Sequence, residues 1–313
     1  MTKKKHIMPR QPGTRSPFAP DGMLRPALKL IGAKVGQKID STRSKVYAII
    51  ESRFGPRHHF YDVFMGSGAV MIGKPVGLGE EICNDINAHP INFYRCMRKD
   101  QDLLMHYIQR HITDMSHEKF DFLKTKLAPV TEKNRFTQAA LFYIVCKFAR
   151  NGIVRYNKSG ENNSTFCMTT EGRGILYDEW SNLLVKRIKR VKFTRLDFRE
   201  FLATQVKPLK SSVVFLDPPY HDVFTMYDRI KFSDKDHEDM AAILKKAPYS
   251  WILTINDTEF IRKIYKGAFI VENEVHWCCS NTNKGRGKKV ELIISSFKYD
   301  PKITHLRPDQ GSN

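Results

Sequence analysis

Long apolar runs are missing from this sequence of 313 residues. None approaches the roughly 20 residues that a membrane-spanning helix needs, and the basic stretch 1–20 has no apolar core of the kind found in secretory signals. Paired cysteines are missing too, because the six cysteines form no Cys-x-x-Cys pair and no evenly spaced framework. We therefore expect a protein of the cytoplasm, neither membrane-bound nor secreted, that holds no metal.

Acidic residues are scarce. The chain carries 33 Asp and Glu against 52 Lys and Arg, a net charge of +19, and such an excess usually indicates a polyanionic partner. Clustered cations release counterions when they neutralise phosphates, so they bind nucleic acid in a salt-dependent way. A basic surface that only keeps the protein soluble is the alternative. The clusters are Lys186, Arg187, Lys189, Arg190, Lys192 and Arg195, and Lys284, Arg286, Lys288 and Lys289.

Short apolar runs alternate with segments of helical periodicity, which is typical of a doubly wound α/β sheet. The segment 96–190 is helical, with a Gly/Asn-rich loop, and interrupts this alternation, so we interpret it as an inserted domain. The sheet then belongs to 24–95 and 191–300, between a disordered basic arm at 1–23 and a tail at 301–313. The expected strands are 60–65, 80–86, 212–217, 249–257 and 288–297, and the clearest helices are 90–112, 137–150 and 236–247.

A glycine-containing turn follows the first expected strand. Gly66 and Gly68 would let the backbone approach a ligand closely, and Asp85 comes nineteen positions after Gly66, at the end of the next strand. Nucleoside-binding folds place a carboxylate there to accept ribose hydroxyls. Met71 stands where the dinucleotide pattern has its third glycine, which favours a smaller nucleoside cofactor. A tight strand–helix turn with a surface Asp is the alternative.

A second motif, Asp217-Pro218-Pro219-Tyr220, follows the apolar run 212–216. Prolines fix φ and supply no donors, so a carboxylate beside their carbonyls makes an acceptor-only cluster suited to an amino group. The Tyr220 ring offers a stacking face for a planar base. Hydrogen bonds from both N–H groups of a base amine would favour a more tetrahedral nitrogen, which can attack a sulfonium methyl group. A Pro-Pro turn that caps a strand is the alternative.

In this order the motifs resemble those of the Dam-like DNA adenine methyltransferases, which transfer a methyl group from S-adenosylmethionine to the adenine amino group. The resemblance spans residues 25–297. For the cofactor, residues 25–34 resemble the N-terminal cofactor segment, residues 64–68 resemble the cofactor loop, and residues 84–87 resemble the ribose-binding turn. Asp197-Phe198 resembles the pair that flanks the cofactor adenine, and residues 151–163 resemble the target-recognition loop. Residues 256–258 and 286–292 match the C-terminal signatures.

The resemblance implies a role for each matching residue. Lys34 and Asp85 would hold the methionine carboxylate and the ribose, and Leu30 stands where the family usually has a stacking aromatic. Asp217, Pro218, Pro219 and Tyr220 would bind the flipped target adenine and form the catalytic motif. The implied cofactor-binding residues are Leu30, Lys34, Phe64, Gly66, Gly68, Asp85, Ile86, Asp197, Phe198 and Asp217.

For DNA, Arg155 falls on the position that reads a guanine, which fits bidentate pairing to O6 and N7, with a phosphate clamp as the alternative. Asn151 could fill the gap left by the flipped base. Ser164-Thr165-Phe166-Cys167 departs from the Val-Pro-Phe-Gly of common GATC readers, so the recognition sequence stays open. The expected DNA-binding residues are Asn151, Arg155, Asn157, Lys186, Arg187, Arg190, Arg286 and Lys288.

Together these observations predict a site-specific DNA adenine methyltransferase with a Rossmann-like sheet and an inserted helical target-recognition domain. We expect a monomer that uses S-adenosylmethionine, no metal and double-stranded DNA, in a bacterial or phage-infected cell. An RNA base-amine methyltransferase, or a non-catalytic DNA-binding protein on the same fold, are the alternatives.

Overall fold

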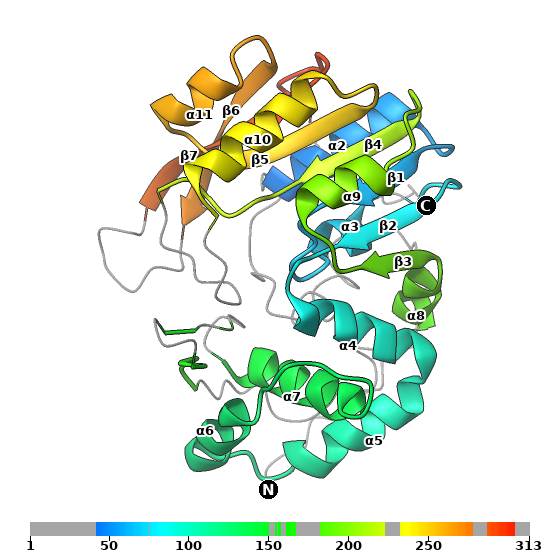
Figure 1. The fold of residues 1–313 in the computed structure, drawn as a ribbon, viewed down its shortest axis with the longest axis vertical. Helices are drawn as coiled ribbons and strands as arrows, with labels where there is room; N and C mark the ends of the chain where they lie inside the picture. Colours follow the sequence, from blue (N-terminus) through cyan, green and yellow to red (C-terminus); the bar gives the residue numbers. More distant parts are fainter. Residues whose placement is uncertain are drawn as a thin grey trace, which may run out of the picture.

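A computed structural model describes residues 42–74, 76–149, 154, 156–157, 161–166, 182–222, 232–277 and 287–303 (Figure 1). Within these residues, seven strands form one sheet in the order β3-β2-β1-β4-β5-β7-β6. Strands β1 to β5 pair in parallel, whereas β7 runs antiparallel to both β5 and β6. The strands are β1 (His59–Asp62), β2 (Glu81–Asn84), β3 (Val191–Thr194), β4 (Ser212–Leu216), β5 (Ser250–Asn256), β6 (Phe269–Trp277) and β7 (Gly287–Ser295).

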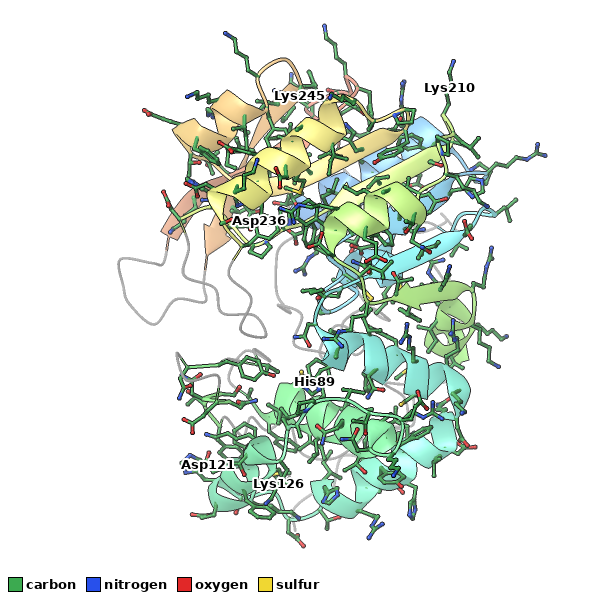
Figure 2. All side chains as sticks on the ribbon, in the orientation of Figure 1. His89, Asp121, Lys126, Lys210, Asp236 and Lys245 are labelled. Carbon is green, nitrogen blue, oxygen red and sulfur yellow. The ribbon has the colours of Figure 1, made fainter. Side chains whose placement is uncertain are left out.

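Helices cover both faces of this sheet, which confirms the predicted doubly wound, Rossmann-like fold. Consecutive strand residues point to opposite faces, so Val213 packs with helix α2 and Val214 packs with α9 and α10. Helix α10 starts at a capping box, in which Ser233 and Asp236 each bond the other's backbone. Figure 2 labels Asp236 in the first turn of this helix. These helices are α2 (Thr42–Phe54) and α3 (Ala69–Gly73) on one side, and α9 (Phe198–Thr204), α10 (Asp234–Lys245) and α11 (Glu259–Ile264) on the other.

One apolar core joins the helical module, which we define as helices α4 to α8 together, to buried residues of β2 and β3. The module lies beyond the β3 end of the sheet, with α4 and α8 next to it (Figure 1). Helix α4 begins before the predicted boundary at residue 96 and contacts both α7 and β3. The bounds are α4 (Ala88–Lys99), α5 (Gln101–Ile112), α6 (His117–Thr125), α7 (Arg135–Phe148) and α8 (Asn182–Lys189).

One predicted helix, 90–112, is wrong as a continuous element. Asp100 adopts an extended backbone between α4 and α5, and its carboxylate accepts the Leu103 N–H at 2.9 Å. The acid therefore caps a new helix, because an Asp side chain competes for backbone donors better than it continues a helix. No helix in the described part of the chain is long and apolar enough to span a membrane.

A buried ionic cluster connects the module to the sheet. Glu81, on β2, is 1 % exposed and forms ion pairs with Lys74 at 2.9 Å and with Arg187 of α8 at 3.0 Å. Arg187 also donates two hydrogen bonds to the Met71 carbonyl. Burial lowers the pKa of Lys74 to about 8. The predicted DNA-binding role of Arg187 is therefore wrong, because helical periodicity turns this residue inward while its basic neighbour Lys186 stays exposed.

We predict that Arg187→Ala lowers the free energy of unfolding by about 3 kcal/mol, because removal of one partner leaves a buried charge short of compensation. Retention of Lys74 beside Glu81 keeps the loss from being larger. Lys186→Ala on the same helix is the matched control and should change stability little. Urea unfolding followed by circular dichroism measures both, and equal midpoints for the two variants would contradict the structural role of Arg187.

Candidate active site

The strand order reverses direction at one place in the sheet. From β1 the chain moves outward to β2 and β3, and it then returns to β4 on the other side of β1. Loops that leave two such strands diverge and leave a crevice at the carboxyl ends, where ligands of open α/β sheets bind. The two loops here are 63–68, after β1, and 217–220, after β4. The fold thus brings both sequence motifs to the same edge of the sheet.

The glycine turn after β1 has a left-handed backbone at both of its glycines. Gly66 and Gly68 have φ values of 51° and 75°. A Cβ on Gly68 would lie 2.8 Å from the hydroxyl oxygen of Tyr94, which itself donates to the Ser67 carbonyl at 2.8 Å. A larger residue at position 68 would therefore suffer both backbone strain and a steric clash. A Cβ on Gly66 would meet nothing within 4 Å, so this part of the turn faces open space.

Asp85 closes the turn from the end of β2. Its two carboxylate oxygens accept the N–H groups of Gly66 at 2.7 Å and Asn87 at 2.8 Å. The neighbouring Asn84 is buried, and its amide nitrogen donates to the carbonyls of Val63 and Leu196 at 3.1 and 3.0 Å. Asn84 therefore ties together the ends of β1, β2 and β3, a role that the sequence did not reveal because the three segments are far apart along the chain.

The loop after β4 is held from β5. The Thr254 hydroxyl donates to Asp217 Oδ1 at 2.9 Å, and the Asn256 amide donates to the His221 carbonyl at 2.8 Å. The Thr258 hydroxyl lies 3.0 Å from Nδ1 of His221. The predicted signature 256–258 thus has a physical use: it fixes the chain that follows Tyr220. Burial raises the pKa of Tyr220 well above its ordinary value, and the Asp217 and Glu291 carboxylates add to this effect.

Asp62 is an acidic residue that the sequence prediction missed. It ends β1, is 1 % exposed, and its Oδ1 has no hydrogen-bond partner among the residues that the structure describes. Burial raises its pKa well above the ordinary value, and the nearby carboxylates of Asp217 and Asp85 raise it further. Acidic side chains thus gather at this edge of a strongly basic protein, and a ligand with cationic groups would relieve the repulsion that raises the pKa of Asp62. The signal available in the sequence was an acid at the end of a buried strand, directly before the glycine turn.

An aromatic cluster borders the same edge. Phe64 lies 5.9 Å from Phe198 and 5.7 Å from Phe232, measured between ring centroids. Asp197 caps α9 by accepting the Arg199 N–H, and the Ile86 carbonyl accepts from Arg195 at 3.0 Å. The predicted cofactor residues that the structure describes therefore cluster at the ends of β1, β2, β3 and β4. Leu30 and Lys34 lie outside the described residues.

Residues 44–277, well over half of the chain, match the D12 class of N6 adenine-specific DNA methyltransferases. The chain belongs to this family. It is 26% identical over 218 residues to the type II methyltransferase M.CviBI of Paramecium bursaria Chlorella virus NC1A, covering 69% of this chain and 79% of that protein. It is 24% identical over 239 residues to a DNA adenine methylase of Vibrio cholerae serotype O1, covering 74% and 84%. The predicted resemblance to adenine-specific DNA methyltransferases is confirmed.

The expected DNA-binding residues of this methyltransferase are only partly described. Asn151, Arg155, Arg286 and the side chain of Lys288 lie outside the described residues. Asn157 closes a turn by bonding Glu161 through both its backbone and its amide. Lys186 and Arg190 are exposed, and Arg190 donates to the Gly77 carbonyl at 2.9 Å. The structure therefore leaves Lys186 and Arg190 as predicted contacts to a polyanion.

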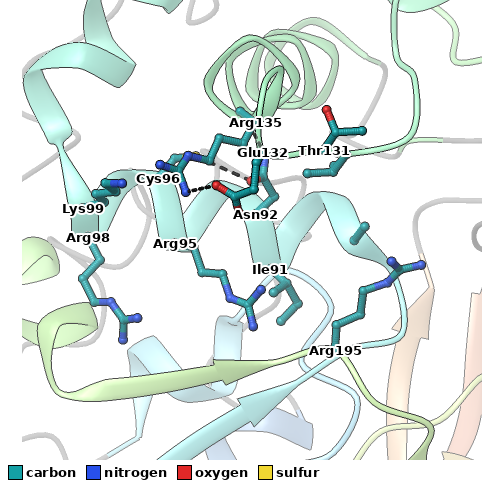
Figure 3. Close-up of a pocket in the computed structure, with 12 residues that line it drawn as sticks. Ile91, Asn92, Arg95, Cys96, Arg98, Lys99, Thr131, Glu132, Arg135 and Arg195 are labelled. Atoms are coloured by element: carbon teal, nitrogen blue, oxygen red, sulfur yellow. Dashed lines mark hydrogen bonds and ion pairs between the residues drawn. The ribbon is translucent and has the colours of Figure 1, made fainter.

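Sequence reasoning missed a cationic cavity of about 610 Å³ between α4, β3 and the start of α7 (Figure 3). Arg95 and Arg98 extend from α4 and donate to the carbonyls of Phe193 at 2.7 Å and Val191 at 2.6 Å, so they cover the outer edge of strand β3. Each guanidinium carries five donors, and these contacts use one from each. The spacing of the basic residues on α4 was the available signal. The described basic residues of the lining are Arg95, Arg98, Lys99, Arg135 and Arg195.

We predict that Asp62→Asn makes this methyltransferase more stable at pH 8 and leaves its stability nearly unchanged near pH 4. The folded pKa of Asp62 lies above the ordinary value of 3.8, so the protonated acid favours the fold at low pH, and this contribution is lost as the pH rises through the folded pKa. Asparagine keeps the shape of the acid without its charge. Thermal unfolding of the ligand-free protein from pH 4 to 8 measures the effect, and parallel curves for parent and variant would contradict it.

Proposed function

We propose that this chain transfers a methyl group from S-adenosylmethionine to N6 of an adenine flipped out of double-stranded DNA at a specific sequence. Family membership supports the reaction. The observation that carries the residue assignment is the reversal of strand order, which places the acceptor motif 217–220 beside the glycine turn. Extrusion of a base from the duplex needs a few kcal/mol, and enzymes that modify a base inside duplex DNA must reach it in this way.

The residues at the strand ends fit this cofactor. S-adenosylmethionine supplies an electrophilic methyl group on a positively charged sulfur. Its sulfonium and ammonium charges suit the acidic edge at Asp62 and Asp85, because a nearby cation would relieve the repulsion that raises the pKa of Asp62. Asp85, which lies beside the glycine turn and accepts the Gly66 N–H, would accept the ribose hydroxyls. The open turn at Gly66 lets the backbone approach the cofactor closely.

The catalytic motif needs only to align groups and to accept hydrogen bonds. Thr254 fixes the carboxylate of Asp217, which with the Pro218 carbonyl would accept the two N–H groups of adenine. These bonds localise the nitrogen lone pair and stabilise the positive charge that develops on it during attack. No general base is required before attack, because the amine proton becomes acidic only after methylation. Tyr220 would stack on the base.

We assign the helical module, with the predicted recognition loop that it carries, to DNA recognition. We further propose that the enzyme acts as a monomer without a metal. Double-stranded DNA is preferred over RNA because the whole matched family acts on DNA.

We predict that Asp217→Ala lowers methylation at least 100-fold and leaves S-adenosylmethionine affinity within a few-fold, because loss of one preorganised group commonly slows turnover by about 10²–10³. Asp222→Asn is the matched control: it changes an exposed acid in the same loop at a positive φ of 56° that asparagine tolerates. The measurement is incubation with unmethylated genomic DNA, followed by single-molecule sequencing, with calorimetry of cofactor binding.

The same experiment on the parent enzyme distinguishes site-specific DNA methylation from the alternative functions. Methyladenine within one short motif supports site-specific DNA methylation. Methyladenine at many unrelated adenines keeps the reaction but contradicts sequence-specific recognition. Unmodified DNA with bound cofactor overturns the DNA substrate in favour of RNA, and absence of cofactor binding overturns the enzymatic assignment.

A second prediction concerns the cationic cavity. We expect Arg98→Gln with Lys99→Gln to reduce the slope of log affinity for duplex DNA against log salt by about 2, one unit for each phosphate that the variant no longer neutralises. The matched control is Lys210→Gln with Lys245→Gln, two exposed cations at the end of the sheet farthest from the helical module (Figure 2). Fluorescence anisotropy at several salt concentrations measures both slopes. Equal slopes for the two double variants would exclude the cavity from the DNA contact.

A further inference from the structure

The C-terminal signature 286–292 contains a buried acid that the proposed reaction does not use. Glu291 is 6 % exposed and lies on β7, where the register places it opposite Asn256 of β5 and Asn273 of β6. A carboxylate buried inside a sheet needs several hydrogen bonds to offset its desolvation. Its partners therefore show what the residue is used for.

Two hydroxyl groups bond to this carboxylate. The Thr42 hydroxyl, at the start of α2, donates to Glu291 Oε2, and the Asn273 amide donates to Thr42 Oγ1 at 3.0 Å. The second hydroxyl is that of Tyr220, which hydrogen-bonds the Glu291 side chain. Glu291 thus connects α2 and β7 with the catalytic loop.

The two residues that face each other across β5 and β7 hold neighbouring residues of that loop. Asn256 donates to the main-chain carbonyl of His221, and Glu291 accepts from the side chain of Tyr220. The two-residue segment Tyr220-His221 is therefore held at two places, through the backbone carbonyl of His221 and through the hydroxyl group of Tyr220. Since the hydroxyl lies on the ring axis, a bond to it sets the direction of the whole side chain.

We propose that Glu291 is a positioning residue that holds the Tyr220 ring in the orientation needed to stack on the target adenine. The proposal rests on the proposed function, in which Tyr220 stacks on the flipped base. A ring oriented before the substrate arrives loses little conformational freedom when the base docks. A hydrogen bond to a buried carboxylate is among the strongest available for this purpose, because the acceptor is charged and shielded from water.

Base stacking can be read directly with 2-aminopurine in place of the target adenine. Its fluorescence rises when it leaves the duplex and is quenched when it stacks on an aromatic ring. The variants are Glu291→Gln, Tyr220→Phe and the double variant. Fluorescence is measured on a duplex that carries 2-aminopurine in the motif that genomic sequencing identifies, and kcat on the same duplex with adenine, because 2-aminopurine has no amino group at C6 to methylate. We expect each single variant to raise the fluorescence of the complex about twofold and to lower kcat about tenfold, with cofactor affinity unchanged.

Comparison of the single variants with the double variant distinguishes a positioning role of Glu291 from a general structural role. If Glu291 acts through the Tyr220 hydroxyl, Glu291→Gln should change neither fluorescence nor kcat further in the Tyr220→Phe background. Additive losses in the double variant overturn the proposal. So does parent-level fluorescence in Tyr220→Phe, which keeps the ring and tests the idea even where Glu291→Gln fails to fold.

Measurements on the parent enzyme distinguish a failure of the positioning role from a failure of the proposed function. A parent that forms no methyladenine overturns the proposed function, whatever the variants do. A parent that methylates its motif alongside a Glu291→Gln variant with unchanged kcat and fluorescence overturns only the positioning role of Glu291.

Discussion

The reversal of strand order between β1 and β4 is the constraint on which the rest of the site depends. It brings two adjacent strand ends to one edge of the sheet, so the glycine turn and the motif 217–220 lie side by side although they are far apart along the sequence. Hydrogen bonds across strand ends then hold these loops in place. Asn84 holds the side of β1, β2 and β3, and Thr254 holds the side of β4. The sheet therefore sets the positions of the two motifs, and the loops carry their side chains at its edge.

Acidic and basic side chains gather on different parts of this protein. A chain with a net charge of +19 gathers the acids Asp62, Asp85 and Asp217 at one edge of the sheet, while exposed cations line the outer side of β3 and α4. An acidic crevice suits a cofactor with a sulfonium and an ammonium group, and a basic surface suits a phosphate backbone. One protein can hold both ligands because the opposite fields lie on different parts of the surface and salt screens them from each other.

The sequence predicted those features that depend on local pattern. Buried runs such as β4 and the turn at Gly66 and Gly68 follow from composition and short spacing, and the structure contains them. Strand β3 was missed because it has only four residues and a lysine in its middle. Arg187 looked like surface charge because the surrounding run is basic, yet only packing decides which face of α8 is buried. The roles of Asn84, Asp62 and Glu291 depend on register between distant strands, which no local pattern encodes.

The attachments of the helical module explain how recognition and chemistry can coexist in one chain. The module leaves the sheet after β2 and returns to it before β3, and Arg187 fastens its last helix to Glu81 and to the end of α3. The loop that starts at Asp217 is held instead from β5 and, through Glu291, from β7 and α2, on the other side of β1. Changes in the module therefore reach the glycine turn and the cofactor side first. The motif 217–220 is fixed by contacts outside the module, so under the proposed roles the module can vary in sequence while the geometry proposed for methyl transfer is kept.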